Sequence, residues 1–314
     1  GIKNQVNLFF LLSVCIIFAI MNRIIRILVL ALVFPFALSA QNDAKTLFEY
    51  PTVPDKLTKT NLRADFMAKH LWDKCDLEKQ EITDISAFAD AFTDYLSFFI
   101  LADKNVVKES VDSFVKRVSK NEKNLQTVIG FVDDYIYSPY SQYCSEDLYG
   151  FFAEAFSKSK KLDSEVRDAM LNNVKKLQAS RIDAVFMDLT LEKGDENATL
   201  HSLASQYYVA ILNIDGNFDT SLYKLRLNTD IATNTLINSG VVTIVSLYSD
   251  KIVKRDGDSE NWYKAEVRDM EDKFDMRVVP CVYVLDKDKK IIAKSPGVEQ
   301  VLEMMAQMSI ALNK

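Results

Sequence analysis

The chain has 314 residues, and its 44 acidic side chains outnumber its 38 basic ones, which gives a net charge of −6. No segment gathers the basic residues into a stripe, so nucleic acid and anionic membrane surfaces are not expected as partners. Hydrophobic residues make up 48% of the chain, which is enough for well-packed cores. At about 100–200 residues per domain, the length predicts two domains.

Residues 1–40 have the composition of a targeting segment, because they contain no acidic residue and are mostly apolar. Arg23 and Arg26 form a positive region, residues 27–36 are an apolar run, and residues 37–40 (ALSA) fit the small-residue pattern of a cleavage site. The pattern therefore predicts a signal peptide.

Cleavage there would place the mature start near Gln41 and send the protein to the periplasm. Met21, just ahead of the positive region, is the expected translation start. Two alternatives stay open, a retained membrane anchor over residues 8–36 and a lipid attached at Cys15. Each apolar half of the possible anchor is short for a span of about 20 residues. A membrane is expected as a partner only through an uncleaved leader. Residues 41–55 then form an extended tether.

Residues 56–180 are predicted to form an all-helical domain. Apolar side chains recur there at three- and four-residue steps, the spacing of one helix face, as in Ile85, Phe88, Phe92, Tyr95 and Phe99. Similar faces follow along the domain, and the alternation typical of strands is absent. The spacing indicates about six helices.

A dense run of aromatic residues lies in the second half of this helical domain. It comprises Tyr135, Tyr137, Tyr140, Tyr143, Tyr149, Phe151 and Phe152. Such a run could line a groove for a glycan or a peptide, or it could serve core and interdomain packing.

The pattern changes at residue 181, from which an α/β domain is predicted to run to residue 314. A strand is expected over residues 184–191, and a nearly continuous apolar run over 207–214 indicates a buried parallel strand. A helix over 219–238, a second buried strand over 241–248 and a polar loop over 250–260 follow.

The last part of the chain completes this domain. A helix is expected over residues 262–274, then a strand entered through Pro280, a hairpin strand over 291–294 and a final helix over 298–312. The predicted fold class is therefore α plus α/β, with a mixed central sheet in the second domain.

The segment Phe274 to Asp286, a strand entered through a proline and followed by a charged turn, resembles the second half of a thioredoxin-like domain. The resemblance places Pro280 at the cis-proline of that fold. Together with residues 48–54 (FEYPTVP) and the helical domain, it makes the chain similar to DUF5106 proteins, a Bacteroidetes family of unknown function. The resemblance covers most of residues 45–314 and implies the fold of exported thiol–disulfide oxidoreductases.

The redox motif of that fold, C-x-x-C, is missing from this chain. The resemblance places the two cysteines at the start of the helix after the first buried strand, where the helix N-terminus lowers a thiol pKa. Phe218 and Ser221 stand at these positions, and neither side chain can exchange disulfides. We therefore expect a degenerate active site with no catalytic residue, no cofactor and no metal.

The expected function is that of an exported, non-catalytic binding protein. A groove beside the cis-proline, formed by Phe218, Ser221, Val279 and Pro280, would hold an extended peptide or a segment of an envelope protein. A structural role in the envelope is a further alternative.

The cysteines leave a second, enzymatic interpretation open. Cys75 and Cys144 could form a disulfide or could both be buried apolar residues. A thiol–disulfide oxidoreductase would act through Cys281, or through Cys75 with Cys144. The alternative for Cys281 is that it is a buried residue of its strand, with no role in thiol chemistry. The two histidines, His70 and His201, lie too far apart in sequence to suggest a zinc site.

Overall fold

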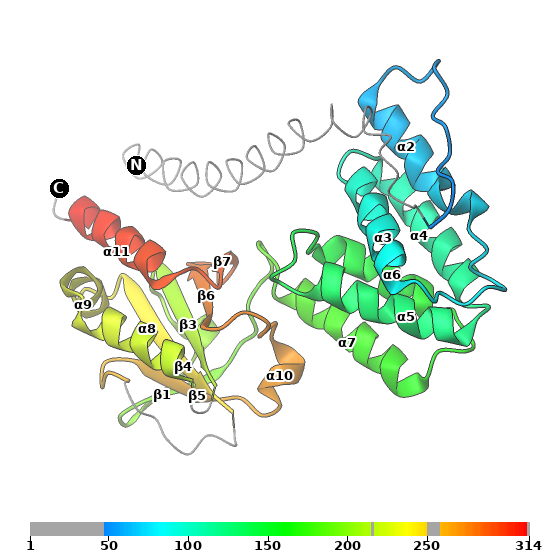
Figure 1. The fold of residues 1–314 in the computed structure, drawn as a ribbon. Helices are drawn as coiled ribbons and strands as arrows, with labels where there is room; N and C mark the ends of the chain where they lie inside the picture. The colour runs from blue at the N-terminus through cyan, green and yellow to red at the C-terminus, as the bar shows by residue number, and fades with distance from the viewer. Residues whose placement is uncertain (1–46, 215–216, 250–257, 313–314) are drawn as a thin grey trace. The chain divides into compact units, whose positions relative to one another are not determined.

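The structure is a computed structural model that describes residues 47–214, 217–249 and 258–312 (Figure 1). Residues from Phe48 onward form one compact unit by their internal contacts. The predicted leader, with Met21 and Cys15, lies outside the described residues, as does most of the predicted polar loop. Within the described ranges, no helix combines the length and apolar character that a membrane crossing requires.

The first part of the unit is helical, as predicted. Its elements are α2 (Thr60–His70), η1 (Leu71–Lys74), α3 (Ile85–Phe99), α4 (Lys104–Val118), α5 (Glu122–Val132), η2 (Asp133–Tyr137), α6 (Glu146–Ser157) and α7 (Ser164–Ala179). Short polar side chains begin most of these helices. Asp84, Asp103, Asn121, Ser145 and Asp163 each accept a hydrogen bond from a backbone N–H of the first turn.

Aromatic rings fill the core of the helical domain. Phe88, Phe92 and Tyr95, which the periodicity placed on one face of α3, are fully buried. The Trp72 ring contacts Phe88, Tyr95 and Phe114 at centroid distances of 4.9–5.5 Å. Phe48, in the middle of the predicted tether, packs on the same tryptophan at 5.4 Å, so this part of the tether contacts the core.

The second part contains a seven-stranded mixed sheet in the order β2-β1-β5-β4-β3-β6-β7 (Figure 1). Its strands are β1 (Thr190–Lys193), β2 (Glu196–Thr199), β3 (Tyr207–Asn213), β4 (Val242–Tyr248), β5 (Tyr263–Glu266), β6 (Cys281–Asp286) and β7 (Ile291–Lys294). Strands β3, β4 and β5 are parallel neighbours, whereas β6 pairs antiparallel with both β3 and β7.

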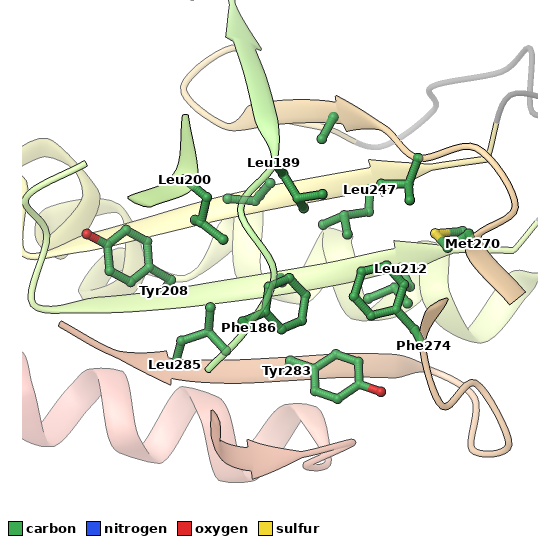
Figure 2. Close-up of a cluster of buried hydrophobic side chains, with 14 of the residues drawn as sticks. Phe186, Leu189, Leu200, Tyr208, Leu212, Leu247, Met270, Phe274, Tyr283 and Leu285 are labelled. Atoms are coloured by element: carbon green, nitrogen blue, oxygen red, sulfur yellow. The ribbon is translucent and has the colours of Figure 1, made fainter. Parts of the chain in front are cut away.

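Helices cover one face of this sheet. The helices α8 (Phe218–Thr229), α9 (Ile231–Asn238) and α11 (Val298–Leu312) pack on one another, and α9 contacts β4. The opposite face carries a cluster of buried apolar side chains, shown in Figure 2, in which Phe186, Phe274 and Tyr283 are in ring contact. Alternate residues of β3 and β6 point into this cluster, as the pleat of a strand requires.

Three predicted elements differ from the structure. The helix expected over residues 262–274 is wrong, because Tyr263–Glu266 forms β5 beside β4 and only α10 (Met270–Lys273) is helical. The helix expected over 219–238 is divided at Asp230, whose extended backbone ends α8 and whose carboxylate caps α9. The strand expected over 184–191 begins at Thr190.

Candidate functional site

Pro280 and the start of α8 both lie at the end of the sheet where strand β3 finishes. Strand β3 ends at Asn213, and β6 begins at Cys281, which pairs with Leu212. Pro280 therefore lies level with the end of β3, and α8 starts a few residues beyond that end. The peptide bond between Val279 and Pro280 is cis.

The two side chains at the expected cysteine positions lie on the first turn of α8. Phe218 is the first residue of the helix and is 75% exposed. Ser221 is exposed, and its hydroxyl donates to the Asn217 carbonyl at 3.3 Å. Asn217 caps the helix, its side-chain oxygen accepting from Thr220 N at 2.8 Å. The helix N-terminus is thus capped by Asn217, and no cysteine lies on its first turn.

Phe218 begins an apolar stripe along α8. Leu222 and Leu225 follow at four and seven residues, which places all three side chains on one helix face. They are 44% and 55% exposed. We call Phe218, Leu222 and Leu225 the α8 stripe. It presents an exposed apolar surface without a reactive thiol.

Val279 and Pro280 are half-buried at the same edge. The Val279 N–H and C=O make no hydrogen bond to any residue that the structure describes. Two such backbone groups can receive the backbone of an extended segment. The strand register and the start of α8 therefore put Val279, Pro280 and Phe218 at the end of the sheet where β3 finishes.

Cys281, the first residue of β6, belongs to the buried core of the α/β domain. It is fully buried, and its thiol donates to the Asp275 carbonyl at 3.3 Å. Burial, together with the nearby Asp275 charge, raises the pKa of the Cys281 thiol to about 12. A thiol in this position is protonated at neutral pH and is out of reach of a protein substrate.

The possible disulfide between Cys75 and Cys144 is not formed, since both are free thiols. Cys75 follows η1, where Arg117 donates to the Cys75 carbonyl, while Cys144 lies beside Arg277. Burial raises the pKa of Cys75 to about 11 and also raises the pKa of Cys144. Both thiols are partly buried, so they belong to neither a disulfide nor a reactive pair.

A charged cluster leads into Pro280 and was missed by the sequence reasoning. The guanidinium of Arg277 binds both carboxylate oxygens of Asp275, at 2.7 and 2.8 Å. Lys294 donates to the same carboxylate. It also donates to the Glu146 carboxylate, at 2.7 Å. Burial alone would raise the pKa of Asp275, but hydrogen bonds from Arg277 and Lys294 lower it to about 2. The cluster fixes the loop ahead of Pro280.

A second buried ion pair lies beneath α8 and was also missed. Lys224 and Asp258 are 2.7 Å apart, with side chains only 3% and 2% exposed. The ammonium also donates to Asn213 Oδ1 at 2.9 Å, and Ser246 donates to the Asp258 carboxylate at 2.7 Å. These bonds tie α8 to the ends of β3 and β4, and no local sequence signal marks them.

Comparisons with known proteins agree with this architecture. Residues 37–180 match the model of the domain of unknown function DUF5106. A thioredoxin-like protein from Bacteroides caccae is similar in structure, with a TM-score of 0.64 and 19% identity, over 83% of this chain and 99% of that chain. Among curated proteins, none matches the sequence.

Two further solved structures match about two fifths of the chain. The C-terminal domain of an uncharacterized protein from Bacteroides fragilis gives a TM-score of 0.35 at 19% identity, over 40% of this chain and 98% of that one. The thioredoxin domain of a thiol-disulfide oxidoreductase from Bacteroides vulgatus gives a TM-score of 0.33 at 14% identity. The match covers 41% of this chain and 98% of that chain.

The fold is thioredoxin-like, with a helical domain ahead of a mixed-sheet α/β domain, and this predicted fold class is confirmed. The match of residues 37–180 to the DUF5106 model confirms the resemblance drawn from the sequence. No two of the four cysteines have the C-x-x-C spacing, which is a property of the sequence itself.

Proposed function

We propose that the protein is a non-catalytic binding protein whose thioredoxin-like domain has kept the fold and lost the thiols. The observation that carries this proposal is Phe218, which stands exposed at the first position of α8 where the attacking cysteine is expected. A phenyl ring has no nucleophile and no acidic proton, whereas an exposed ring is a good anchor for an apolar partner.

The partner that suits this edge is an extended peptide or a segment of an envelope protein. Its backbone would pair with the free N–H and C=O of Val279, and an apolar side chain would rest on the α8 stripe. Ser221, exposed beside Phe218, adds a hydroxyl that can bind the peptide backbone.

Thiol–disulfide exchange is the less supported function. It would need the thiolate of Cys281, Cys75 or Cys144, and burial raises the pKa of all three. Thiol exchange slows as the thiolate fraction falls. No observation favours this alternative over binding.

A gain-of-function experiment tests the loss of redox chemistry. The wild-type protein and the double variant Phe218→Cys/Ser221→Cys are compared in reduction of insulin disulfides by dithiothreitol. We expect the wild type to match the uncatalysed rate and the double variant to exceed it, because the helix N-terminus is intact. A wild-type rate well above background, abolished by Cys281→Ala, would overturn the proposal.

Binding is tested separately with a phage-displayed peptide library. We expect selected peptides to lose affinity in Phe218→Ala but not in Leu62→Ala, a change at a 42% exposed apolar residue on α2. Peptides that bind both variants equally, or a library that yields none, would count against the sheet edge as the binding site.

Export to the periplasm is also part of the proposal, and it is supported by the signal-peptide pattern of residues 1–40. The test is cell fractionation of the full-length protein followed by intact mass measurement. A mature form that starts at Gln41 in the periplasmic fraction is expected. A full-length form in the membrane fraction would instead favour the retained anchor.

A further inference from the structure

The helical domain contains a hollow that the proposed function does not use. Its volume is about 420 Å³, within the range of about 300–1,000 Å³ typical of small-molecule sites. Eight residues line it: Thr93, Asp134, Tyr135, Ser138, Tyr140, Ser141, Gln142 and Tyr143. Three of these residues, Tyr135, Tyr140 and Tyr143, belong to the aromatic run for which the sequence left a groove and packing as alternatives.

The wall of the hollow is held in place by its own hydrogen bonds. Asp134 and Tyr135 come from η2, a single π-helical turn, a feature frequent at functional sites. The hydroxyl of Ser141 donates to the Tyr135 carbonyl at 2.6 Å and accepts from Tyr143 N at 3.1 Å. The loop thus has a defined conformation before any ligand binds, which lowers the entropy cost of binding.

Every residue that lines the hollow carries a polar functional group. Six of the eight residues carry a hydroxyl, Gln142 carries an amide and Asp134 a carboxylate. None of them carries a positive charge, so an anionic ligand would find no counter-charge. None is aliphatic, so a purely apolar ligand would leave the hydroxyls without partners.

Tyrosine rings give the hollow its flat surfaces. Tyr140 is 82% exposed, so its ring has a face free for a ligand. The Tyr135 ring is stacked on Phe131 at 5.6 Å and 8°, and it also contacts Phe92 at 6.1 Å and Tyr143 at 6.4 Å. The negative face of an aromatic ring attracts weakly positive C–H groups, such as those on one side of a sugar ring.

We propose that this hollow is a binding site for a neutral carbohydrate, which would stack on Tyr140 and exchange hydrogen bonds with the surrounding hydroxyl, amide and carboxylate groups. The Asp134 carboxylate makes no hydrogen bond or ion pair with a residue that the structure describes, so it can accept from sugar hydroxyls. The Thr93 hydroxyl already donates to the Asp90 carbonyl at 2.9 Å and therefore presents only an acceptor.

The test is calorimetric titration of the protein with a panel of neutral oligosaccharides: maltotriose, cellotriose, xylotriose, mannotriose and chitotriose. We expect at least one to bind. We also expect its affinity to fall by about tenfold in Tyr140→Ala and to be largely kept in Tyr140→Phe, since stacking needs only the ring. Gln142→Ala should weaken binding as well.

Ile231→Ala is the matched control, because it removes another highly exposed apolar side chain, 84% exposed, outside the hollow. It should leave carbohydrate binding unchanged. The proposal is overturned if no sugar binds at millimolar concentration, or if binding is the same in Tyr140→Ala. It is also overturned if the hollow instead binds a lysine-rich peptide in a manner lost in Asp134→Asn, which would make it a cation site.

Discussion

The Cys281 thiol is held in its neutral form by its surroundings. Cys281 belongs to the buried apolar cluster of the α/β domain, and its thiol donates to the Asp275 carbonyl. Burial favours the uncharged form of an acid, which is why the pKa of this thiol rises to about 12.

This environment leads to a prediction for thiol reactivity. In native protein at pH 8, Cys281 should resist iodoacetamide, and Cys75 and Cys144 should react slowly, because all three have raised pKa values. All three should be labelled after denaturation. Mass mapping of the alkylated peptides is the measurement. Rapid native labelling of Cys281 would contradict the structure.

Asp275 provides a prediction for stability and its pH dependence. Its pKa is about 2 when folded and 3.8 ordinarily, so it stabilises the fold above pH 3.8 and this contribution is lost as the pH falls toward 2. Asp275→Asn should remove about 2 kcal/mol of unfolding free energy at pH 7, because Arg277 and Lys294 lose their counter-charge.

Urea unfolding at pH 7 and pH 3 measures the Asp275 contribution. The matched control is Asp288→Asn, whose side chain is 65% exposed and which should change stability by less than about 0.5 kcal/mol. The difference between Asp275→Asn and the wild type should shrink at low pH. An equal difference at both pH values would rule out this linkage.

Single-residue features were predictable from the sequence only where a local pattern marks them. The replacement of the redox cysteines by Phe218 and Ser221 follows from position within a strand–helix unit. The pairing of Arg277 with Asp275 is a local signal that was overlooked. The contacts of this pair with Glu146 and Lys294 join segments far apart in the chain, and no spacing rule reveals them.

At the scale of elements, the Lys224–Asp258 pair connects α8 with the segment that leads into β5. Lys224→Met should destabilise the protein by about 3 kcal/mol, because the Asp258 carboxylate stays buried without its cation. Chemical denaturation measures the effect.

A control for this change lies on the same helix. Arg226 pairs with Glu299 at 2.7 Å, but the two side chains are 46% and 71% exposed. Arg226→Met should therefore lower stability by less than about 1 kcal/mol. If the two methionine variants were equally stable, the buried pair would contribute no more than a surface pair.

Helices and strands were predicted well where one hydrophobic periodicity runs through a long segment. They were predicted poorly where the secondary structure depends on pairing with another strand. The face of α3 and the apolar runs of β3 and β4 were found from spacing alone. Strand β5 is only four residues long and exists because it pairs with β4, Val245 lying opposite Tyr263. A four-residue segment rich in charge carries no strand signal of its own.

At the scale of the whole molecule, the charged cluster links the helical and thioredoxin-like domains. Glu146 at the start of α6 contacts Lys294 at 2.7 Å and Arg277 at 3.5 Å. Arg277 also lies over the Tyr137 ring at 4.5 Å. These contacts couple the two parts energetically, so their unfolding should be one event.

Each domain carries one buried tryptophan, which makes the coupling measurable. Trp72→Phe leaves Trp262 as the fluorescent reporter of the thioredoxin-like domain, and Trp262→Phe leaves Trp72 for the helical domain. Urea midpoints should coincide in these two variants. Adding Glu146→Gln should separate them and cost about 1 kcal/mol of coupling.

The control for the coupling is Glu154→Gln, a change on the same helix. Glu154 contacts Lys108 at 2.8 Å within the helical domain. It should leave the two midpoints together. Separate midpoints without any change at Glu146 would show that the domains unfold independently.

The division into a helical and an α/β part was evident from the change in periodicity near residue 181. The contacts between the parts were not, because they depend on loops whose geometry follows from the folded domains. The carbohydrate hollow illustrates this limit, since the aromatic run was visible but its division into buried and exposed rings was not. Tyr149 is fully buried, whereas Tyr140 is 82% exposed.

The segment that joins the domains also lies along the outer strand of the sheet. Asp183 N donates to Ile291 O at 2.9 Å, Ile291 N donates to Ala184 O at 2.9 Å, and Phe186 N donates to Lys289 O at 2.8 Å. The linker thereby occupies backbone groups of β7 that would otherwise be open to another chain. A fragment cut to begin at β1 would expose that edge, so the excised domain should be prone to self-association and aggregation.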